Sequence, residues 1–230
     1  MANRFFTRQV LGPGPVLLDG DDAHHLGTVR RFVSGEIVTL FNGDGFEYSA
    51  VVESVNKRTT MLKVTDRRIA ERESKRHVTI ASALPKGDRF DFLIEKLVEL
   101  GCSKLIPLMT KRSVVKPSEE KREKWERAVI EASKQCGRNR LMTISAPQRF
   151  DSWITTVSGV RYLLHTDEEQ LFPRILSTEP ITVAIGPEGG WSEAEIKAAI
   201  DASWSIASLG TRTLRIESAA LVATTLAVNS

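Results

Sequence analysis

The stretch that most constrains this sequence is residues 185–195, a loop with three glycines and one proline. An apolar run at residues 181–185 precedes it and predicts a short buried strand, while an amphipathic run at 193–202 predicts a helix. Ser192, with Glu195 three residues later, forms a capping box that marks where the helix begins. Glycine lets a ligand lie against bare backbone groups, and open α/β sheets bind ligands at strand ends of this kind.

This loop matches no phosphate-binding signature. It lacks the Gly-Lys-Ser/Thr end of a P-loop, and no lysine or arginine occurs between residues 175 and 195. A tight turn with a helix cap remains the alternative. A second predicted strand, residues 206–209, is also followed by a glycine, a polar loop and an apolar helix. Two such corners in succession predict one pocket built from both loops.

The rest of the C-terminal part repeats the alternation of strand and helix. Further strands are predicted at residues 78–84, 104–108 and 161–166. Helices are predicted from Asp88 to Gly101 and from Ser118 to Gly137, where the glycines end them. A last helix at 218–228 is nearly all small and apolar, so we expect it to be buried, against a partner subunit. The pattern is typical of a mostly parallel sheet with helices on both faces.

Residues 1–72 show a different, all-β pattern with one helix. Short apolar runs recur with turn signals between them, at residues 15–18, 37–41, 46–52 and 61–64. Asn42-Gly43-Asp44-Gly45 predicts a hairpin turn, and one helix is expected to start at Asp21 or Asp22. A small β-barrel is the simplest architecture for this pattern. The charged stretch 67–76 lacks apolar periodicity and predicts a linker, so we divide the chain into domains 1–72 and 73–230.

Composition excludes several classes of protein. The 230-residue chain has no apolar run near the length of a membrane span and no signal-peptide core. Its two cysteines, Cys102 and Cys136, have no metal-ligand spacing, so we expect no metal and a cytoplasmic protein with reduced thiols. Residues 54–77 hold eight Lys/Arg against three Asp/Glu, and residues 111–140 hold ten against five. A polyanionic partner would meet these two segments; solvated surface charge is the alternative.

Two motifs together resemble the signature of a known family. Gly-Pro-Glu-Gly-Gly at residues 186–190 is followed by Leu-Gly-x-Arg-x-Leu-Arg-x-Glu-x-Ala from residue 209. The pair resembles the RsmE family, bacterial 16S rRNA uridine-N3 methyltransferases of the SPOUT class. Phe5-Phe6, residues 24–32 and the segment Glu-Ala-Ser-Lys-Gln-Cys-Gly-Arg-Asn at 131–139 extend the resemblance along the whole chain. The sequence departs from the family pattern at Thr213 and Ile216, and a hydroxyl usual at the second position is absent.

The resemblance implies a fold, a cofactor and partners. It implies an N-terminal PUA-like RNA-binding β-barrel and a C-terminal SPOUT α/β domain with a trefoil knot, in a homodimer. The cofactor implied is S-adenosyl-L-methionine, the substrate is 16S rRNA of the small ribosomal subunit, and no membrane is involved. Three loops would bind the cofactor, through Leu164, His165, Thr166, Ile185, Gly186, Pro187, Glu188, Gly189, Gly190, Leu209, Gly210, Leu214 and Arg215.

Candidate RNA contacts come from the arginines and lysines of the basic segments and of the N-terminal part. They are Arg4, Arg8, Arg30, Arg31, Arg112, Lys134, Arg138 and Arg140. The cations at residues 134–140 equally suit the carbonyl end of a helix, whose dipole favours positive charge. His24-His25 could ligate a metal, but a structural role at a helix end or a phosphate contact is favoured.

Catalysis is assigned to two residues of the matched second motif. Uridine N3 carries a proton that must leave before the nitrogen attacks a methyl carbon, so a group that stabilises the uridine anion is needed. Arg215 is the first candidate for this role. Glu217 would orient Arg215 by ion pairing or accept the proton itself; a salt bridge that merely locks the loop is the alternative.

Two other functions remain possible at the level of sequence. A non-catalytic RNA-binding protein would need the basic segments but not the glycine loops, and it would bind no cofactor. A nucleotide-binding metabolic enzyme would act on small molecules and would leave the N-terminal β module unexplained. The methyltransferase is therefore the leading hypothesis.

Overall fold

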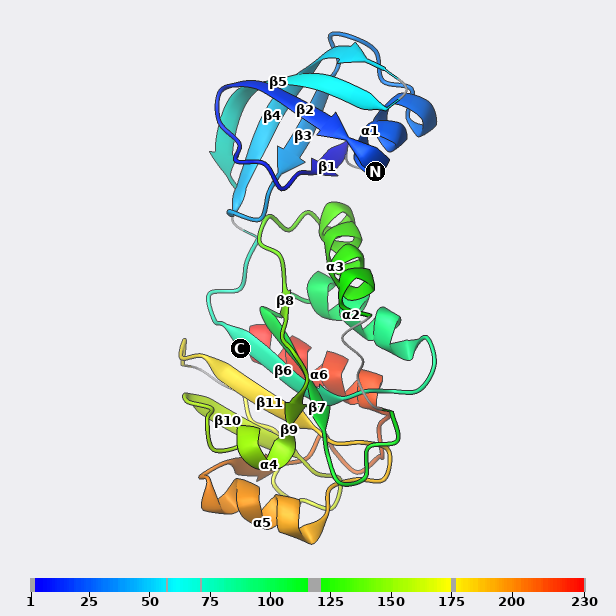
Figure 1. The fold of residues 1–230 in the computed structure, drawn as a ribbon. Coiled ribbons are helices and arrows are strands. Elements are labelled where there is room, and N and C mark those ends of the chain that lie inside the picture. The colour runs from blue at the N-terminus through cyan, green and yellow to red at the C-terminus, as the bar shows by residue number, and fades with distance from the viewer. Residues whose placement is uncertain (1–2, 57, 71, 116–120, 175–176, 230) are drawn as a thin grey trace. The chain divides into compact units, whose positions relative to one another are not determined.

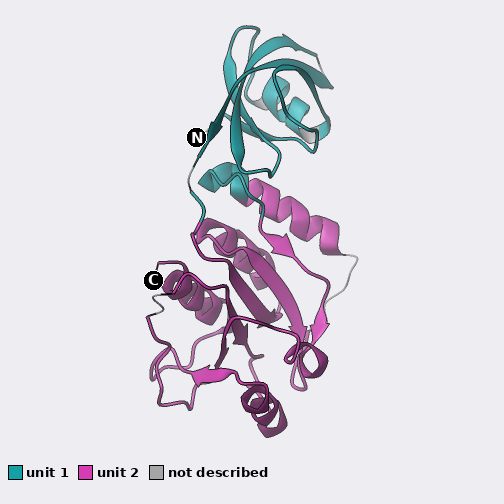
Figure 2. Cartoon of the chain, turned by 90° about the vertical axis from the view of Figure 1, so that its left-hand side faces the viewer, with its two compact units in different colours: residues 1–73, 133–141 teal, residues 74–132, 142–230 magenta. Residues whose placement is uncertain are grey.

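A computed structural model describes residues 3–56, 58–70, 72–115, 121–174 and 177–229 of the chain. The chain divides into two compact units, which Figure 2 colours separately. Unit 1 consists of residues 1–73 and 133–141, and unit 2 consists of residues 74–132 and 142–230. Neither unit is therefore one continuous stretch of sequence.

Unit 1 contains a five-stranded sheet in the order β1-β3-β4-β5-β2, which curls around its own hydrophobic core (Figure 1). Its strands are β1 (Arg4–Phe6), β2 (Gly14–Asp19), β3 (Ile37–Phe41), β4 (Phe46–Val55) and β5 (Thr59–Ile69). Neighbours pair antiparallel except β1, which pairs parallel with β3. Two register shifts between the long strands β4 and β5 bend the sheet. The predicted β module is confirmed, although β1 has no counterpart in the sequence prediction.

The predicted hairpin turn joins β3 to β4. Gly43 and Gly45 have φ angles of +94° and +99°, which side chains with a Cβ rarely adopt. The side chain of Asn42 accepts a hydrogen bond from the Asp44 amide, and that of Asp44 accepts one from the Phe46 amide. These short polar side chains thus replace backbone partners inside the turn.

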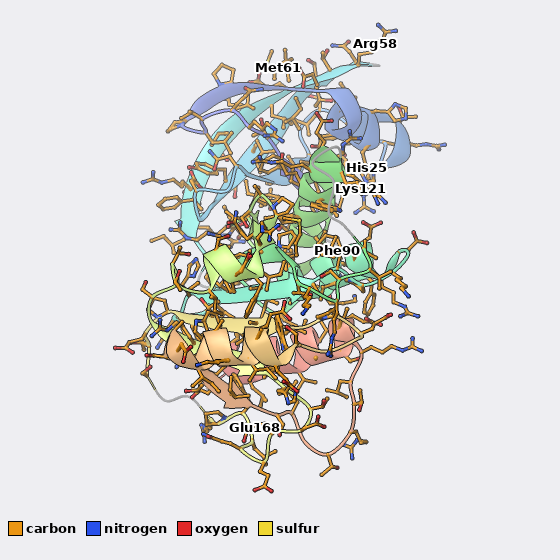
Figure 3. All side chains as sticks on the ribbon, turned by 60° about the horizontal axis from the view of Figure 1, so that its bottom comes forward. His25, Arg58, Met61, Phe90, Lys121 and Glu168 are labelled. Carbon is orange, nitrogen blue, oxygen red and sulfur yellow. The ribbon has the colours of Figure 1, made fainter. Side chains whose placement is uncertain are left out.

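The helix of unit 1 begins at Gly20, just before the predicted start at Asp21 or Asp22, and changes type along its length. Helix α1 spans Gly20–His24 and continues as one π-helical turn, η1, at His25–Val29. In this turn the Arg30 amide reaches back to the His25 carbonyl, five residues earlier. Gly27 lets this turn lie close to β4, since a Cβ there would be 2.8 Å from Val55 Cγ1. His25, labelled in Figure 3, packs edge-on against Phe5.

A buried carboxylate, Glu47 on β4, organises the charged residues of unit 1. It accepts hydrogen bonds from Arg4, Arg72 and Arg68, and its side chain is only 2% exposed. The same arginines reach the second segment of the unit: Arg4 donates to the carbonyl of Arg138 and the side chain of Asn139, and Arg72 donates to the carbonyl of Gly137. We call this set of residues the Glu47 cluster. It fastens residues 133–141 to the curled sheet.

The structure also corrects the predicted linker at residues 67–76. Strand β5 continues to Ile69, so residues 67–69 belong to the sheet rather than to a linker. Arg72 pairs with Glu47, and Glu73 pairs with Arg138 at 2.6 Å. A charged stretch without apolar periodicity looks like a linker because sequence alone does not show that its charges have partners 25 and 65 residues away.

Burial alone would raise the pKa of Glu47, but the hydrogen bond from Arg72 and the charge and hydrogen bond of Arg4 outweigh it. Together they lower the pKa of Glu47 to about 2. Burial lowers the pKa of Arg4, and its contacts with Glu47 act in the opposite direction. The carboxylate therefore stays ionised at neutral pH although it is almost out of contact with water.

Unit 2 contains a seven-stranded sheet in the order β12-β10-β11-β6-β7-β8, with β9 also on β7. The strands are β6 (Val78–Ala83), β7 (Lys104–Met109), β8 (Thr143–Ile144), β9 (Gln148–Arg149), β10 (Val160–Leu164), β11 (Ile181–Ile185) and β12 (Ser205–Ala207). Every pairing is parallel. The predicted parallel sheet is confirmed, and all its strands point their carboxyl ends to the same edge.

Helices cover both faces of this sheet (Figure 1). They are α2 (Arg89–Glu99), α4 (Phe150–Trp153), α5 (Glu193–Asp201) and α6 (Ile216–Val228). Helix α3 (Arg122–Cys136) contacts α2 instead, where Trp125 packs edge-on against Phe90, and its last residues belong to unit 1. Helix α6 packs on α2, β6 and β11, while α4 contacts α5. Gly101 and Gly137 follow α2 and α3 with φ of +88° and +86°, as the sequence predicts. The predicted cap of α3, Ser118, lies outside the described residues.

Helix α6 begins two residues earlier than predicted and is buried on one side only. Its inner face, with Ala220, Ala223 and Ala227 fully buried, packs against the sheet and α2. On its outer side Val222 and Leu226 are 39% and 40% exposed. The single chain thus buries the inner face, and burial of the outer side against a partner subunit stays a prediction.

Candidate active site

A cavity of about 560 Å³ lies at the carboxyl edge of the parallel sheet in unit 2. Its walls come from three loops, which follow β10, β11 and β12. All thirteen predicted cofactor residues line it, from Leu164 in the first loop to Arg215 in the third. The volume suits a small organic ligand. The strand ends thus bring together the residues that the two sequence motifs and the strand at 161–166 single out.

The glycine loop after β11 is shaped around one aromatic side chain, Trp191. Its indole Nε1 donates a 2.9 Å hydrogen bond to the carbonyl of Leu164, at the end of β10. The ring lies so close to Gly186 that a Cβ there would be 2.9 Å from Cε2. At the other end of the loop Gly190 has φ +68° and donates its amide to the carbonyl of Pro187. Glycine is thus needed for space at residue 186 and for backbone conformation at residue 190.

The capping box predicted at α5 is present in full. Ser192 Oγ accepts the Glu195 amide, and the Glu195 carboxylate accepts the Ser192 amide at 2.8 Å. The second oxygen of Glu195 accepts the amide of Lys111, in the loop after β7. The start of α5 is therefore tied to a neighbouring strand end, which fixes where the glycine loop finishes.

Arg112, a predicted RNA contact, lies in the wall of this cavity. Its Nη1 donates to the carbonyls of Gly189 at 2.9 Å and Trp191 at 3.1 Å. The guanidinium thus clamps the glycine loop from the side of β7. On either side of it in sequence, Lys111 and Ser113 line a second cavity of about 560 Å³ together with Arg149 and Asp151.

Sequence reasoning missed several residues of the first cavity. The further lining residues are Arg112, Asp167, Trp191, Arg212, Thr213, Ile216 and Ala219. For Trp191 a signal was available, since it directly follows the second of two glycines and interrupts an otherwise polar loop. Asp167 follows the predicted loop residues 164–166 directly, and its amide bonds His165 Nδ1 at 3.2 Å.

The two predicted catalytic residues occupy different positions at the start of α6. Arg215 is exposed, lines the cavity and is the residue before the first turn of the helix. Glu217 is buried, with its side chain 11% exposed, and does not line the cavity. Among the described residues Glu217 forms its ion pair with Arg89, at 3.8 Å, and no ion pair joins it to Arg215. The loop-locking salt bridge between Arg215 and Glu217 is thus not observed.

Three of the predicted RNA contacts are used inside unit 1. Arg4 and Arg138 are both buried: Arg4 pairs with Glu47, and Arg138 pairs with Glu73. Lys134 pairs with Asp22 at 2.6 Å and is largely buried. These cations fasten the end of α3 to the curled sheet, so we remove them from the candidate RNA contacts. Sequence shows their charge but not the distant carboxylates that neutralise it.

The remaining candidates of unit 1 lie on its surface. They are Arg8, Arg30, Arg31 and Arg140, all exposed. The turn between β4 and β5 adds Arg58, which projects from the sheet in Figure 3. Arg31 has a φ of +54°, which is rare for a side chain with a Cβ.

Two further features of the described residues bear on the kind of site. No group of three or more His, Cys, Asp or Glu side chains is arranged to hold a metal ion there. In the same part of the chain, every helix is too short or too polar to cross a membrane.

A parallel sheet with a glycine-loop cavity at its carboxyl edge, in one chain with a curled β unit, defines the class of protein. A family model described as an RNA methyltransferase domain matches residues 72–228. A second model, described as an RNA methyltransferase PUA domain, matches residues 18–61. The chain is thus of the RNA methyltransferase class.

Individual relatives specify the family. Ribosomal RNA small subunit methyltransferase E of Bacillus subtilis is 33% identical over 233 residues, covering 94% of this chain and 91% of that protein. A methyltransferase of Legionella pneumophila, solved with bound SAM, is 31% identical over 98% of this chain and 96% of its own, with a TM-score of 0.90. The Neisseria gonorrhoeae methyltransferase E, bound to S-adenosyl methionine, is 28% identical over 97% and 95%, also at 0.90. The chain belongs to the ribosomal RNA small subunit methyltransferase E family.

Proposed function

We propose that this protein transfers a methyl group from S-adenosyl-L-methionine to N3 of a uridine in 16S rRNA of the small ribosomal subunit. The observation that carries the proposal is the convergence of three strand-end loops on one cavity, in a chain of this family. Domain 1–72, PUA-like, would bind RNA, and domain 73–230 would bind the cofactor and hold the reacting uridine.

The chemistry of the cavity fits this cofactor. Bare backbone at Gly186, Gly190 and Gly210 offers amide and carbonyl groups to an adenine edge, beside the apolar side chains of Ile185 and Leu209. The carboxylates of Asp167 and Glu188 line the cavity and would face the cationic sulfonium, while the guanidinium groups of Arg112, Arg212 and Arg215, which also line it, would face anionic groups of the cofactor or the RNA. When bound, S-adenosyl-L-methionine supplies an electrophilic methyl group. Leu164, His165 and Thr166 would hold it from the side of β10.

Two side chains at the start of α6 would act on the uridine. Arg215 is exposed in the cavity wall and presents up to five N–H donors to the negative charge that spreads over the uracil ring as N3 loses its proton. Glu217 lies two residues further, and its carboxylate is the candidate acceptor of that proton; since it does not line the cavity, the transfer would require its side chain to turn toward the uridine or a water to lie between them. Arg89 Nε lies 3.8 Å from Oε1 of Glu217, on the helix that follows the third cavity loop.

The RNA itself would be held mainly by surface arginines of unit 1, among them Arg8, Arg30, Arg31 and Arg140. We expect Arg30→Ala/Arg31→Ala to weaken binding of small-subunit RNA and to lower the slope of log affinity against log salt, by roughly one unit for each lost phosphate contact. The matched control is Arg122→Ala/Arg127→Ala on α3, whose exposed guanidinium groups pair with Glu126 and Glu123 of the same helix. Filter binding at several salt concentrations measures the affinity and the slope for each variant. An unchanged slope in the first variant removes these arginines from the RNA surface.

Cofactor affinity should depend on the space at Gly186. We expect Gly186→Ala to lower the affinity for S-adenosyl-L-methionine by about tenfold or more, because its methyl group displaces the Trp191 ring. Isothermal calorimetry measures the effect. Gly12→Ala is the control, since its Cβ meets no atom within 4 Å. Equal affinities in the two variants would show that the ring moves without cost.

The finer points of architecture are part of the same proposal. The chain leaves edge strand β12, lines the cavity with residues 209–210 and 212–216 and then packs α6 on α2; we expect a trefoil knot in this stretch because the chain belongs to this family. The exposed Val222 and Leu226 of α6, with Phe92 of α2 at 45%, support a homodimer through this side. Light scattering of the purified protein measures the oligomeric state. A substrate in the ribosomal subunit implies a cytoplasmic enzyme.

A methyl-transfer assay tests the function. Labelled S-adenosyl-L-methionine is supplied with small subunits from a strain that lacks the enzyme, and the product nucleoside is identified by mass. We expect label in N3-methyluridine. Label in another nucleoside, or cofactor binding without transfer, would contradict the uridine assignment. If the protein shows no cofactor binding and no methyl transfer, the plain RNA-binding role becomes the better explanation.

A further inference from the structure

Two cations outside the cavity reach its glycine loop. Lys86 lies in the turn between β6 and α2, and Arg89 is the first residue of α2; Gly87, whose φ is +67°, stands between them. Lys86 Nζ is 3.5 Å and Arg89 Nη1 is 3.8 Å from the carboxylate of Glu188. Glu188 belongs to the glycine loop and lines the cavity, but no residue from 84 to 90 does.

The guanidinium of Arg89 also faces a second carboxylate. Its Nε lies 3.8 Å from Oε1 of Glu217, in the first turn of α6. One side chain at the start of α2 therefore stands between the loop after β11 and the helix that follows the third cavity loop. Arg89 and Glu188 are each 41% exposed in their side chains, so these ion pairs contribute little to stability. Their geometry is better explained by a role of Arg89 in orienting the two carboxylates.

We propose that Arg89 is a positioning residue that couples the cofactor loop, through Glu188, to the carboxylate of Glu217, with Lys86 as a second tie to Glu188. The inference rests on the proposed function, since it assumes that the cavity binds S-adenosyl-L-methionine. Closure of the glycine loop on the cofactor then fixes Arg89, and Arg89 fixes the direction in which Glu217 presents its oxygens.

Amide hydrogen exchange tests the coupling without RNA and without catalysis. Residues 84–90 do not line the cavity, so cofactor contacts would not protect them directly. We expect S-adenosyl-L-methionine to slow their exchange several-fold in the wild type and to leave it unchanged in Arg89→Met. Exchange in residues 186–191 should slow in both. If the cofactor slows exchange at 84–90 equally in the wild type and in Arg89→Met, the proposal is overturned. It is also overturned if exchange there does not slow in a wild type that calorimetry shows to be saturated with cofactor.

Kinetics test whether the coupling serves catalysis. In single-turnover assays at saturating cofactor we expect Arg89→Met to slow methyl transfer at least tenfold, with the cofactor dissociation constant changed less than threefold. Arg89→Lys should restore most of the rate. In a double-mutant cycle, adding Glu217→Gln to Arg89→Met should slow the reaction no further. Additive losses would overturn the link to Glu217.

A matched control separates positioning from folding. Arg122→Met removes an exposed arginine that also pairs with a glutamate, Glu126, at 3.1 Å, and it should change neither exchange at 84–90 nor rate. Arg89→Met should melt within about 2 °C of this control. A wild type that binds cofactor and shows the exchange coupling but methylates another nucleoside would contradict the uridine assignment while leaving the role of Arg89 intact.

Discussion

Arg215→Ala should abolish methyl transfer while leaving the affinity for S-adenosyl-L-methionine nearly unchanged. We expect the single-turnover rate to fall by about 10²–10³-fold, the usual loss when a donor to a developing anion is removed from a preorganised site. The side chain is exposed in the cavity wall and, among the described residues, forms no ion pair that the variant would break. Folding should therefore be unaffected.

The measurement combines single-turnover transfer to small subunits with calorimetry of cofactor binding. Arg127→Ala, which removes a 74% exposed arginine on α3, is the control for a general loss of positive charge. Arg215→Lys should keep the charge but only part of the hydrogen bonding, and so recover part of the rate. If Arg215→Ala loses cofactor affinity as much as rate, the residue binds the cofactor and the assignment to the uridine anion is wrong.

Glu47→Ala should destabilise unit 1 by about 3–5 kcal/mol, since it leaves Arg4 buried without its carboxylate partner. The four tryptophans of the chain all lie in unit 2, so their fluorescence does not follow this unit. Unfolding of unit 1 is therefore measured by amide hydrogen exchange in β3, β4 and β5. Glu53→Ala, an exposed glutamate on the same strand, is the control.

The same carboxylate predicts an acid transition of unit 1. Its pKa of about 2 in the folded unit lies below the ordinary value of 4.5, so the unfolded chain binds the proton more readily. Glu47 therefore contributes its full stabilisation, about 3 kcal/mol, above about pH 5. The contribution declines as the pH falls through 4.5 and is lost near pH 2. In Glu47→Gln this part of the pH dependence should disappear; an unchanged acid transition would show that other groups cause it.

Much of the fold follows from local sequence patterns. The strand-loop-helix corner at 181–201 combines an apolar run, glycines and a capping box, all of them local signals, and the structure contains each. The same holds for the hairpin turn at residues 42–45. The cavity follows from a topological rule, because parallel strands bring their carboxyl ends to one edge wherever the loops stand in the sequence.

Pairings between distant charges could not be predicted. Arg4 meets Glu47 across 43 residues and Asn139 across 135, and nothing in the local sequence of Arg138 distinguishes it from a surface arginine. Lys86 and Arg89 were missed for the same reason, since their partners follow about a hundred residues later. The close approach of Gly27 to Val55 also arises only in the folded unit, so the sequence alone does not show why a glycine stands in the π-helical turn at His25–Val29.

The division of unit 1 between residues 1–73 and 133–141 has a consequence for synthesis on the ribosome. Translation completes the five strands when residue 69 is made, yet the carbonyls of Gly137 and Arg138 that meet Arg72 and Arg4 come almost seventy residues later. A nascent chain that has just emerged past β5 therefore carries a curled sheet in which Arg4 and Arg72 do not yet have the carbonyls of residues 137 and 138 as hydrogen-bond acceptors. The N-terminal unit, although made first, reaches its final form only after about 60% of the protein has been translated.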